Sequence, residues 1–317
     1  MRVGFVGGGE GALKAYLALR SEAEIGTIVG VVCAAESPVA RHGLTRCDSV
    51  GELMRVCAPD AVYVATPVHT HLHIAREVVE HGGVVLLEKP MTTTVEEAER
   101  FAATEGPRTD RVFVALKKRY GAAIACLREA VWRAGVAHIQ MEWRIVVRPN
   151  HWRQDVAASG GGVIADLGCH LFDLAELFGG RVKSIATTSA APTTLFDAER
   201  EAECVLELES GTRAVVRLVW AEQGARDFRM LLQLRDGRTA SLRRGDDGLQ
   251  DEVEVDGIAR SFEAATEYLN MFRNLGRVLA GASDALPGWT EGLHNVRLVE
   301  TARRSLAEGG RALDVIR

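Results

Sequence analysis

The sequence predicts an α/β fold in two parts: a doubly wound parallel sheet, then a domain with a large, mostly antiparallel open sheet. Up to about Leu116, short valine-rich apolar runs alternate with helical patterns, as in parallel strands buried on both faces. After Lys117, apolar residues alternate along segments that Gly and Asp turns separate, as in antiparallel sheets. We therefore expect two domains, 1–117 and 118–317.

The first domain is expected to contain five buried strands joined by helices in right-handed βαβ units. The predicted strands are Arg2–Val6, Ile28–Cys33, Ala61–Ala65, Val84–Leu87 and Val112–Leu116. The predicted helices are Gly11–Ser21, Ser49–Cys57, His71–His81 and Val95–Thr104. The last helix has the clearest start, because the run Thr92-Thr93-Thr94 supplies an N-cap and Glu96 and Glu97 make its first turn acidic.

The second domain is expected to open with a helix and a long strand, followed by a loop, a glycine run and another helix. These segments are Ala122–Ala134, His138–Val147, 148–159, Gly160-Gly161-Gly162 and Val163–Phe178. The antiparallel strands predicted after them are Ser184–Ser189, Ala202–Leu208, Thr212–Trp220, Arg229–Leu234, Thr239–Arg243 and Glu252–Val255. Two helices, Glu263–Leu279 and Thr290–Glu308, follow the sheet.

Composition excludes several classes of function. The 317 residues are 47% hydrophobic and 26% charged with a net charge of −5, which is ordinary for a soluble globular protein. The sequence has no basic-aromatic block for nucleic acid and no apolar run near the roughly 18–20 residues of a membrane span. Six scattered cysteines without a Cys-x-x-Cys pair, and an N-terminus without a signal-peptide layout, favour a cytoplasmic protein.

A glycine-rich turn follows the first strand and opens the first helix, and its residues are Gly7, Gly8, Gly9, Gly11 and Ala12. Small residues let the backbone approach a pyrophosphate on a helix N-terminus, so the turn predicts NAD or NADP as cofactor. The end of the second strand normally selects between them, and Ala34 stands there in place of the usual acid. Glu36 could reach a ribose and Ser37 or Arg41 a phosphate, so both cofactors stay open.

Two more strand ends carry polar residues at the sheet edge where open α/β folds bind ligands. Thr66 and Pro67 follow the third strand with His71 close behind, and Glu88 and Lys89 follow the fourth. All five are candidates for cofactor binding. Lys89 is also a catalytic candidate, because a lysine can be tuned into a proton donor or acceptor.

Asp166, His170 and Asp173 recur at i, i+4 and i+7, on one face of a predicted helix. An Asp–His pair could relay protons, with Asp166 tuning His170. The same spacing could bind a metal ion, or it could mark polar residues that cap and pair with their neighbours. Spacing alone leaves these three interpretations open.

Four residues are candidates for substrate contacts: Lys117, after the last strand of the first domain, and His151, Trp152 and Arg153, on the loop before the Asp–His helix. Their hydrogen-bonding and stacking groups suit a polyol or sugar. Ordinary surface-loop chemistry explains the same residues equally well. Three other tryptophans are expected in the core or at an interface, namely Trp143, Trp220 and Trp289.

The order and spacing of these motifs resemble the Gfo/Idh/MocA family, the glucose–fructose oxidoreductase and inositol dehydrogenase group. The resemblance spans nearly the whole chain. It rests on Ala65-Thr66-Pro67-x-x-x-His71, Glu88-Lys89-Pro90, Arg119-Tyr120, Trp152-Arg153, Gly160-Gly161-Gly162, Asp166-x-x-x-His170-x-x-Asp173 and Glu291-Gly292-Leu293. It implies a Rossmann domain followed by an α/β domain whose open sheet commonly forms a dimer or tetramer interface.

The resemblance also implies roles for single residues. Lys89 would help to bind the nicotinamide and take part in proton transfer. Asp166 and His170 would form the catalytic pair, with His170 as acid/base at the substrate hydroxyl, and no metal is implied. Asp173 matches a recurrent acid that could be structural or could contact substrate. Val68 stands where many members have Asn, which puts one polar contact to the cofactor in doubt.

We therefore expect an NAD(P)-dependent oxidoreductase that moves hydride between nicotinamide and a secondary alcohol or ketone of a sugar, cyclitol or related polyol. A homodimer or homotetramer is expected. One alternative enzyme uses bound NAD(P) transiently during an epimerisation or elimination. The other alternative is a non-catalytic nucleotide-binding regulator, which the presence of Lys89, Asp166 and His170 disfavours.

Overall fold

The structure is a computed structural model that describes residues 1–147, 154–189, 198–245, 248–282 and 285–316. The chain forms two compact units: unit 1 comprises Met1–Lys117 and Tyr268–Leu293, and unit 2 comprises Lys118–Glu267 and His294–Arg317. The predicted domains divide the chain only once, after residue 117, whereas in the structure the late segment Tyr268–Leu293 belongs with the N-terminal residues. Within the described ranges, no helix is long and apolar enough to cross a membrane.

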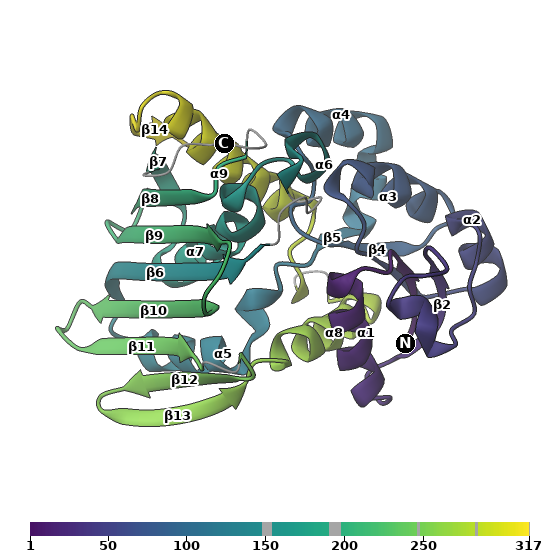
Figure 1. Ribbon diagram of the computed structural model, residues 1–317, viewed down its shortest axis with the longest axis horizontal. Helices are drawn as coiled ribbons and strands as arrows, with labels where there is room; N and C mark the ends of the chain where they lie inside the picture. Colours follow the sequence, from purple (N-terminus) through teal and green to yellow (C-terminus); the bar gives the residue numbers. More distant parts are fainter. Residues whose placement is uncertain (148–153, 190–197, 246–247, 283–284, 317) are drawn as a thin grey trace. The chain divides into compact units, whose positions relative to one another are not determined.

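Unit 1 is built on a five-stranded sheet with the order β2-β1-β3-β4-β5 (Figure 1). All neighbouring strands pair in parallel, which confirms the predicted doubly wound sheet. The strands are β1 (Arg2–Val6), β2 (Thr27–Val32), β3 (Ala61–Val64), β4 (Val84–Leu87) and β5 (Val112–Val114). Every residue of β3 and β5 is buried, which explains why their sequences are continuously apolar rather than alternating.

Helices and short turns connect these strands. The helices are α1 (Glu10–Ser21), α2 (Val50–Glu52), the π-helix η2 (Leu53–Cys57), α3 (His71–Glu80) and α4 (Val95–Glu105). The 3₁₀ turns are η1 (Val39–His42), η3 (Val68–Thr70), η4 (Gly106–Arg111) and η5 (Lys117–Tyr120). Thr94 caps α4 as predicted, because its hydroxyl accepts the N–H of Glu97 at 3.2 Å.

Helix α8 (Thr266–Leu279) shows why a late segment belongs to unit 1. Phe272 is fully buried, and its ring centre lies 6.3 Å from that of Phe5 on β1 and 5.7 Å from that of Tyr63 on β3. Beyond the helix, the N–H of Val114 on β5 donates to the Pro287 carbonyl at 2.8 Å. An amphipathic pattern predicts that this helix has an apolar face, but it does not say which sheet that face covers.

Unit 2 is built on a nine-stranded sheet with the order β13-β12-β11-β10-β6-β9-β8-β7-β14 (Figure 1). The pair β6 and β9 is parallel, and the other neighbouring pairs are antiparallel, which confirms the predicted sheet. Its strands are β6 (Val136–Val146), β7 (Val182–Thr188), β8 (Glu201–Leu208), β9 (Arg213–Ala221), β10 (Asp227–Leu234), β11 (Thr239–Arg244), β12 (Gln250–Val255), β13 (Ile258–Glu263) and β14 (Leu313–Asp314).

The prediction lacks β13 and β14, and the reasons differ. No residue of β13 is buried, so its sequence shows no apolar alternation, and the prediction wrongly starts the next helix at Glu263. Strand β14 has two residues, too few for any periodic pattern. Its place in the sheet comes from pairing with β7.

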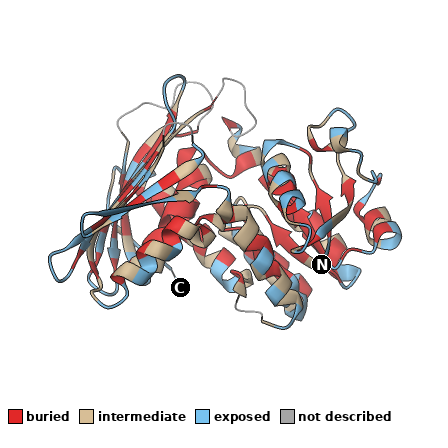
Figure 2. Cartoon of the chain, turned by 90° about the horizontal axis from the view of Figure 1, so that it is seen from below, coloured by how far each residue is buried: buried red, intermediate tan, exposed pale blue. Residues whose placement is uncertain are grey.

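Helices cover one face of the nine-stranded sheet. Helix α5 contacts β11, β12 and β13, and α7 contacts β6 and β9. The helices of this unit are α5 (Ala122–Val131), α6 (Val156–Ser159), the π-helix η7 (Ile164–Gly168), α7 (Cys169–Gly179) and most of α9 (Trp289–Ala307). The strands alternate between buried and more exposed residues (Figure 2), so the other face of the sheet is open.

Candidate functional site

The glycine-rich turn between β1 and α1 needs glycine at two positions for steric reasons. Gly7 has a φ of +105°, and a Cβ there would lie 2.3 Å from the Ala65 carbonyl oxygen. A Cβ at Gly8 would lie 2.3 Å from the hydroxyl oxygen of Ser37. These glycines let the turn pass directly beside the residues that follow β2 and β3.

Gly9 and Gly11 face open space. Outside helix α1 and their chain neighbours, no described atom comes within 4 Å of the Cβ position of either glycine. Gly9 is the N-cap residue of α1, and no side chain caps this end of the helix. The open space beside the first-turn N–H groups fits a pyrophosphate, which those groups and the helix dipole would stabilise.

The turn after β2 presents both an acid and a base. Ala34, Glu36 and Arg41 are exposed. Ser37, which packs against Gly8, accepts the N–H of Ala40 with its hydroxyl oxygen at 3.3 Å. An acid suits the ribose 2′-hydroxyl of NAD and a base suits the 2′-phosphate of NADP, so the chemistry of this turn does not select between the two cofactors.

His71 joins the turns after β3 and β4. Its ring nitrogens lie 3.1 Å from the Thr66 carbonyl oxygen and 3.3 Å from the Met91 carbonyl oxygen. The residue is fully buried, and burial lowers the pKa of the imidazole, although the contacts with the Thr66 and Met91 backbone act to raise it. His71 therefore holds Thr66 against the turn that carries Lys89. Its predicted contact with the cofactor, like that of Pro67, stays a prediction.

Glu88 lies among polar side chains at the carboxyl ends of β4 and β5. Its carboxylate accepts the Tyr63 hydroxyl at 2.5 Å and the backbone N–H of Lys89 at 3.2 Å. The Lys117 ammonium lies 3.4 Å from the same carboxylate and 4.9 Å from the ring centre of Tyr268. Burial opposes ionisation, but the charges of Lys117 and Lys89 outweigh it and keep the pKa of Glu88 below its ordinary value. An ionised Glu88 therefore fixes the backbone at Lys89.

In unit 2, Glu199 holds the glycine run that precedes η7. Its buried carboxylate accepts the N–H groups of Gly162 at 3.1 Å and Ile164 at 3.2 Å. Its carbonyl accepts the N–H of Val163 at 2.8 Å. A Cβ at Gly162 would lie 2.2 Å from that carbonyl oxygen, so this close approach requires glycine. These bonds fix the start of the segment that carries Asp166.

Asp166 and His170 lie on consecutive turns where the π-helix η7 passes into α7. Asp166 is half-buried, and its Oδ2 accepts the indole N–H of Trp220 at 3.2 Å. His170 is 1% exposed, and its ring centre lies 5.7 Å from that of Trp143. Single π-helical turns inside helices occur often at functional sites, because they change where a helix directs its side chains.

Asp173 lies one turn further along α7, in an ion pair with Arg119 of η5. Two guanidinium nitrogens contact its two oxygens, and the Nε–Oδ2 distance is 3.0 Å. The Asp173 side chain is 4% exposed, against 24% for Arg119. Burial raises the pKa of Asp173 even though the charge of Arg119 opposes the rise. Asp173 therefore has a structural partner, and its predicted contact with substrate stays a prediction.

Two side chains of helix α9 form hydrogen bonds with helix α7. The buried Asn295 donates from Nδ2 to the Cys169 carbonyl at 2.8 Å, directly before His170. The neighbouring His294 places Nε2 2.7 Å from a Glu176 oxygen. These contacts hold the first and last turns of α7 and thereby restrict the residues between them.

The structure thus brings the predicted residues together within each unit. In unit 1 the glycine turn, Thr66, His71, Glu88, Lys89 and Lys117 follow the carboxyl ends of the strands. In unit 2, Asp166, His170 and Asp173 share one helical segment. The predicted substrate residues His151, Trp152 and Arg153 lie outside the described residues. Across the ranges that the structure describes, no three His, Cys, Asp or Glu side chains are placed to hold a metal ion.

The partners of these residues are not predicted by the sequence patterns. Trp220 is 3% exposed, as expected of a core residue, but it also donates to Asp166. Trp143 contacts His170 rather than only filling the core. The strand pattern could have indicated that both tryptophans lie near the helix that carries His170, because both occupy positions that face the helices. Across β6 and β9, Trp143 pairs with Leu218 and Trp220 pairs with Ile145. No sequence motif indicates that Glu199 binds the glycine run before η7.

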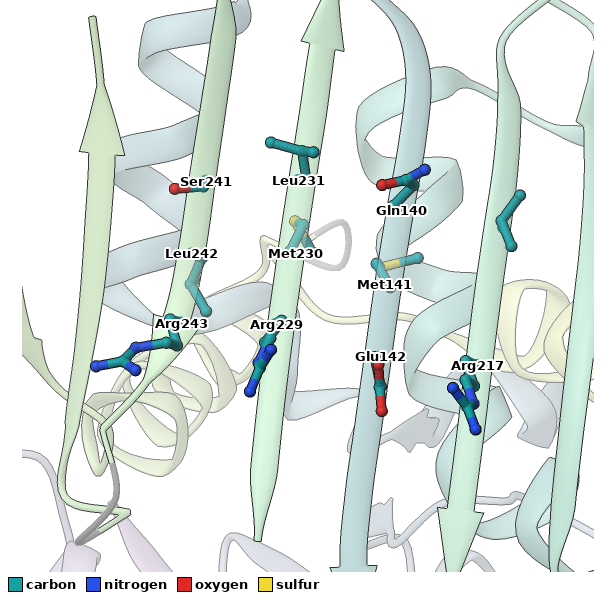
Figure 3. A pocket seen from close by; sticks show the side chains of 11 residues that line it. Gln140, Met141, Glu142, Arg217, Arg229, Met230, Leu231, Ser241, Leu242 and Arg243 are labelled. Carbon is teal, nitrogen blue, oxygen red and sulfur yellow. The ribbon is translucent and has the colours of Figure 1, made fainter. Parts of the chain in front are cut away.

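A hollow of about 410 Å³ lies on the open face of the nine-stranded sheet (Figure 3). Gln140 and Glu142 of β6 line this face (Figure 3). Trp143 follows Glu142 along the strand and therefore lies on the other face of the sheet, toward the helices. His170 contacts Trp143 on the helix-covered face. The hollow is therefore separate from the candidate site.

The fold and the site can be compared with known proteins. Residues 1–116 match the oxidoreductase family with an NAD-binding Rossmann fold, and residues 133–240 match the GFO/IDH/MocA C-terminal domain. The rhizopine catabolism protein MocA of Rhizobium meliloti is 24% identical over 227 residues, which cover 68% of this chain and 70% of that protein. The inositol 2-dehydrogenase of Rhizobium meliloti is 21% identical over 264 residues, covering 78% and 79%.

Among solved structures, levoglucosan dehydrogenase in complex with NADH superposes with a TM-score of 0.82 at 15% identity, over 100% of this chain and 99% of that one. At this identity the likeness concerns the fold alone. The two family matches together cover most of the chain, including the whole first sheet and β6 to β10 of the second, and they agree with the open glycine turn in unit 1. This chain belongs to the GFO/IDH/MocA family of oxidoreductases, and its N-terminal part is an NAD(P)-binding Rossmann domain.

Proposed function

We propose that this protein is an NAD(P)-dependent dehydrogenase or reductase acting on a secondary alcohol or ketone of a sugar, cyclitol or related polyol. The observation that carries the proposal is the pair of supported proton-handling groups. Lys89 follows β4 of the NAD(P)-binding unit on a backbone fixed by Glu88, and His170 is buried beside Trp143 in unit 2. Both residue types can exchange protons near neutral pH when their surroundings tune them.

Bound NAD(P) would supply the hydride acceptor or donor at its nicotinamide ring. We assign His170 as the acid/base for the substrate hydroxyl, because imidazole titrates near working pH. Asp166 is assigned to tune His170 from the preceding turn. Lys89 is assigned to bind the nicotinamide and share the proton, because it follows β4 of the NAD(P)-binding unit.

The remaining assignments follow the same proposal. The residues assigned to cofactor binding are Gly7, Gly8, Gly9, Gly11, Ala12, Ala34, Thr66, Pro67, His71, Glu88 and Lys89. The residues assigned to substrate are Lys117, His151, Trp152, Arg153 and Asp173. The names of two relatives support the substrate class, because inositol and levoglucosan are small polyhydroxylated molecules.

Calorimetric titration with NAD and with NADP, followed by a panel of polyols with the preferred nucleotide, tests this function. We expect saturable binding of at least one nucleotide and a stoichiometric change in reduced-nicotinamide absorbance with at least one polyol. Conversion of a substrate with no net absorbance change would instead indicate transient use of the nucleotide. Tight nucleotide binding without conversion of any polyol would contradict the enzyme and favour a nucleotide-binding regulator.

We also propose that the open face of the nine-stranded sheet mediates self-association into a dimer or tetramer. Half-exposed Val215 and Leu231 lie beside Arg217, Glu142 and Arg229, whose charges alternate in sign across neighbouring strands (Figure 3). Such a mixed apolar and charged face can complement a second copy of itself. In sedimentation velocity, we expect an oligomer for the native chain and a monomer for Leu231→Lys. A native monomer at micromolar concentration would overturn the proposal.

A further inference from the structure

Trp143 links His170 to a buried cation. The indole lies on β6, and its ring centre is 5.7 Å from that of His170, with 43° between the ring planes. The ammonium of Lys118 lies 4.8 Å from the centre of the indole ring. A cation at this distance from an aromatic face is attracted by the ring, and the attraction strengthens when water is excluded.

Lys118 is itself held by a buried group of charges. Its side chain is 4% exposed, and Nζ lies 2.5 Å from Oε1 of Glu267. Arg244 places Nη2 2.9 Å from the same oxygen and also binds Asp251 through two hydrogen bonds of 2.7 and 2.8 Å. The ring of Phe228, 5.1 Å from the ammonium, contacts Trp143 at 5.6 Å. Two cations and two anions therefore balance behind the indole.

The protonation states follow from these neighbours. Burial acts to raise the pKa of Glu267, but the charges of Lys118 and Arg244 outweigh it and lower that pKa to about 2. Burial lowers the pKa of Lys118 to about 8 against the attraction of Glu267. At neutral pH the ammonium is therefore charged, although it is buried.

We propose that Trp143, held in place by Lys118, is a positioning residue for His170. The indole limits rotation of the imidazole, and the ammonium beyond it disfavours a second positive charge on that ring. This inference rests on the proposed role of His170 as acid/base. It adds two residues from β6 and η5 that do not share the helix of the Asp–His pair.

Other charged groups near His170 also affect its pKa, and their effects differ in sign and size. Asp166, one turn earlier, favours the imidazolium, although its Oδ2 is engaged by Trp220. Asp173, one turn later, is compensated by the guanidinium of Arg119. Against this background, removal of the Lys118 charge raises the pKa of His170, because it removes one of the two cations behind the indole and leaves Glu267 and Asp251 to share Arg244.

Four variants test the inference: Trp143→Leu, Trp143→Phe, Lys118→Met and, as a control, Trp132→Leu, which removes an indole that is 78% exposed. We expect Trp143→Leu to lower kcat about tenfold with nucleotide affinity unchanged, because a mispositioned acid/base slows chemistry without weakening cofactor binding. Trp143→Phe should retain most of the wild-type kcat, and Trp132→Leu should leave kcat unchanged. Lys118→Met should raise the pKa of His170 by about half a unit.

Histidine NMR measures that pKa without relying on activity, and a His170→Asn variant identifies the signal among the nine histidines. Unchanged His170 shifts and pKa in both Trp143→Leu and Lys118→Met, with both variants folded, would overturn the inference. If the His170 signal responds but the His170→Asn variant turns over normally, the positioning contact stands and the proposed catalytic role fails. Thermal unfolding of each variant separates these outcomes from misfolding, and Trp143→Phe retains a ring if Trp143→Leu does not fold.

Discussion

Replacement of His170 by alanine is expected to lower kcat by about 10²-fold or more, while the dissociation constant of the nucleotide stays within about twofold. The reason is that His170 belongs to unit 2, on a buried turn of α7, whereas the glycine turn and the residues after β4 belong to unit 1. The variant therefore loses the proposed acid/base without losing a proposed cofactor contact. Steady-state kinetics with the polyol found by the panel, together with calorimetry, measures both quantities.

Two comparisons sharpen this expectation. Lys89→Ala should lower kcat by a similar factor but also weaken nucleotide binding, because Lys89 follows β4 in the NAD(P)-binding unit. His73→Ala removes an imidazole that is 77% exposed on α3 and should leave both quantities unchanged. Near-normal turnover in a folded His170→Ala variant would refute the assignment of His170 as acid/base, whatever the other two variants do.

Much of the fold could be predicted because the apolar pattern of each element reflects its burial. Strands such as β3, buried on both faces, are continuously apolar, and those of the large sheet, such as β8, alternate. The same logic explains the errors. Strand β13 buries none of its residues, so no pattern marks it, and the contact of Phe272 with the first sheet depends on tertiary packing alone.

The candidate site likewise contains residues that the sequence predicts and partners that it does not. Residues with distinctive chemistry at element ends, such as Lys89 and His170, stand out in the sequence because few structural roles require them there. Their partners do not, because Glu199, Trp143 and Trp220 are ordinary strand or loop residues until the fold brings them near. Local spacing left open whether Asp173 binds a metal ion or pairs with a neighbouring side chain, and its partner in the structure is Arg119.

Replacement of Arg119 by methionine is expected to lower the free energy of unfolding by about 3–5 kcal/mol, because it leaves a carboxylate buried without its cation. Asp173 is 4% exposed and both its oxygens contact the guanidinium, so solvent cannot replace the lost partner. A control in the same unit is Arg304→Met, which breaks an Arg–Glu pair whose arginine is 50% exposed and should cost less than about 1 kcal/mol. Urea unfolding at pH 7 measures both effects.

The pH dependence of this loss identifies its cause. Burial already raises the pKa of Asp173 above its ordinary value, and removal of Arg119 raises it further, so the folded variant binds a proton more readily than the unfolded chain does. Stability of the Arg119→Met variant relative to wild type should therefore rise as the pH falls from 7 toward 5, where a neutral carboxyl needs no cation. The double variant Arg119→Met/Asp173→Leu, which removes both charges, should regain most of the loss at pH 7 and show no such trend. A loss that stays constant with pH, and that the double variant does not recover, would mean that Arg119 stabilises unit 2 through its packing rather than through its charge.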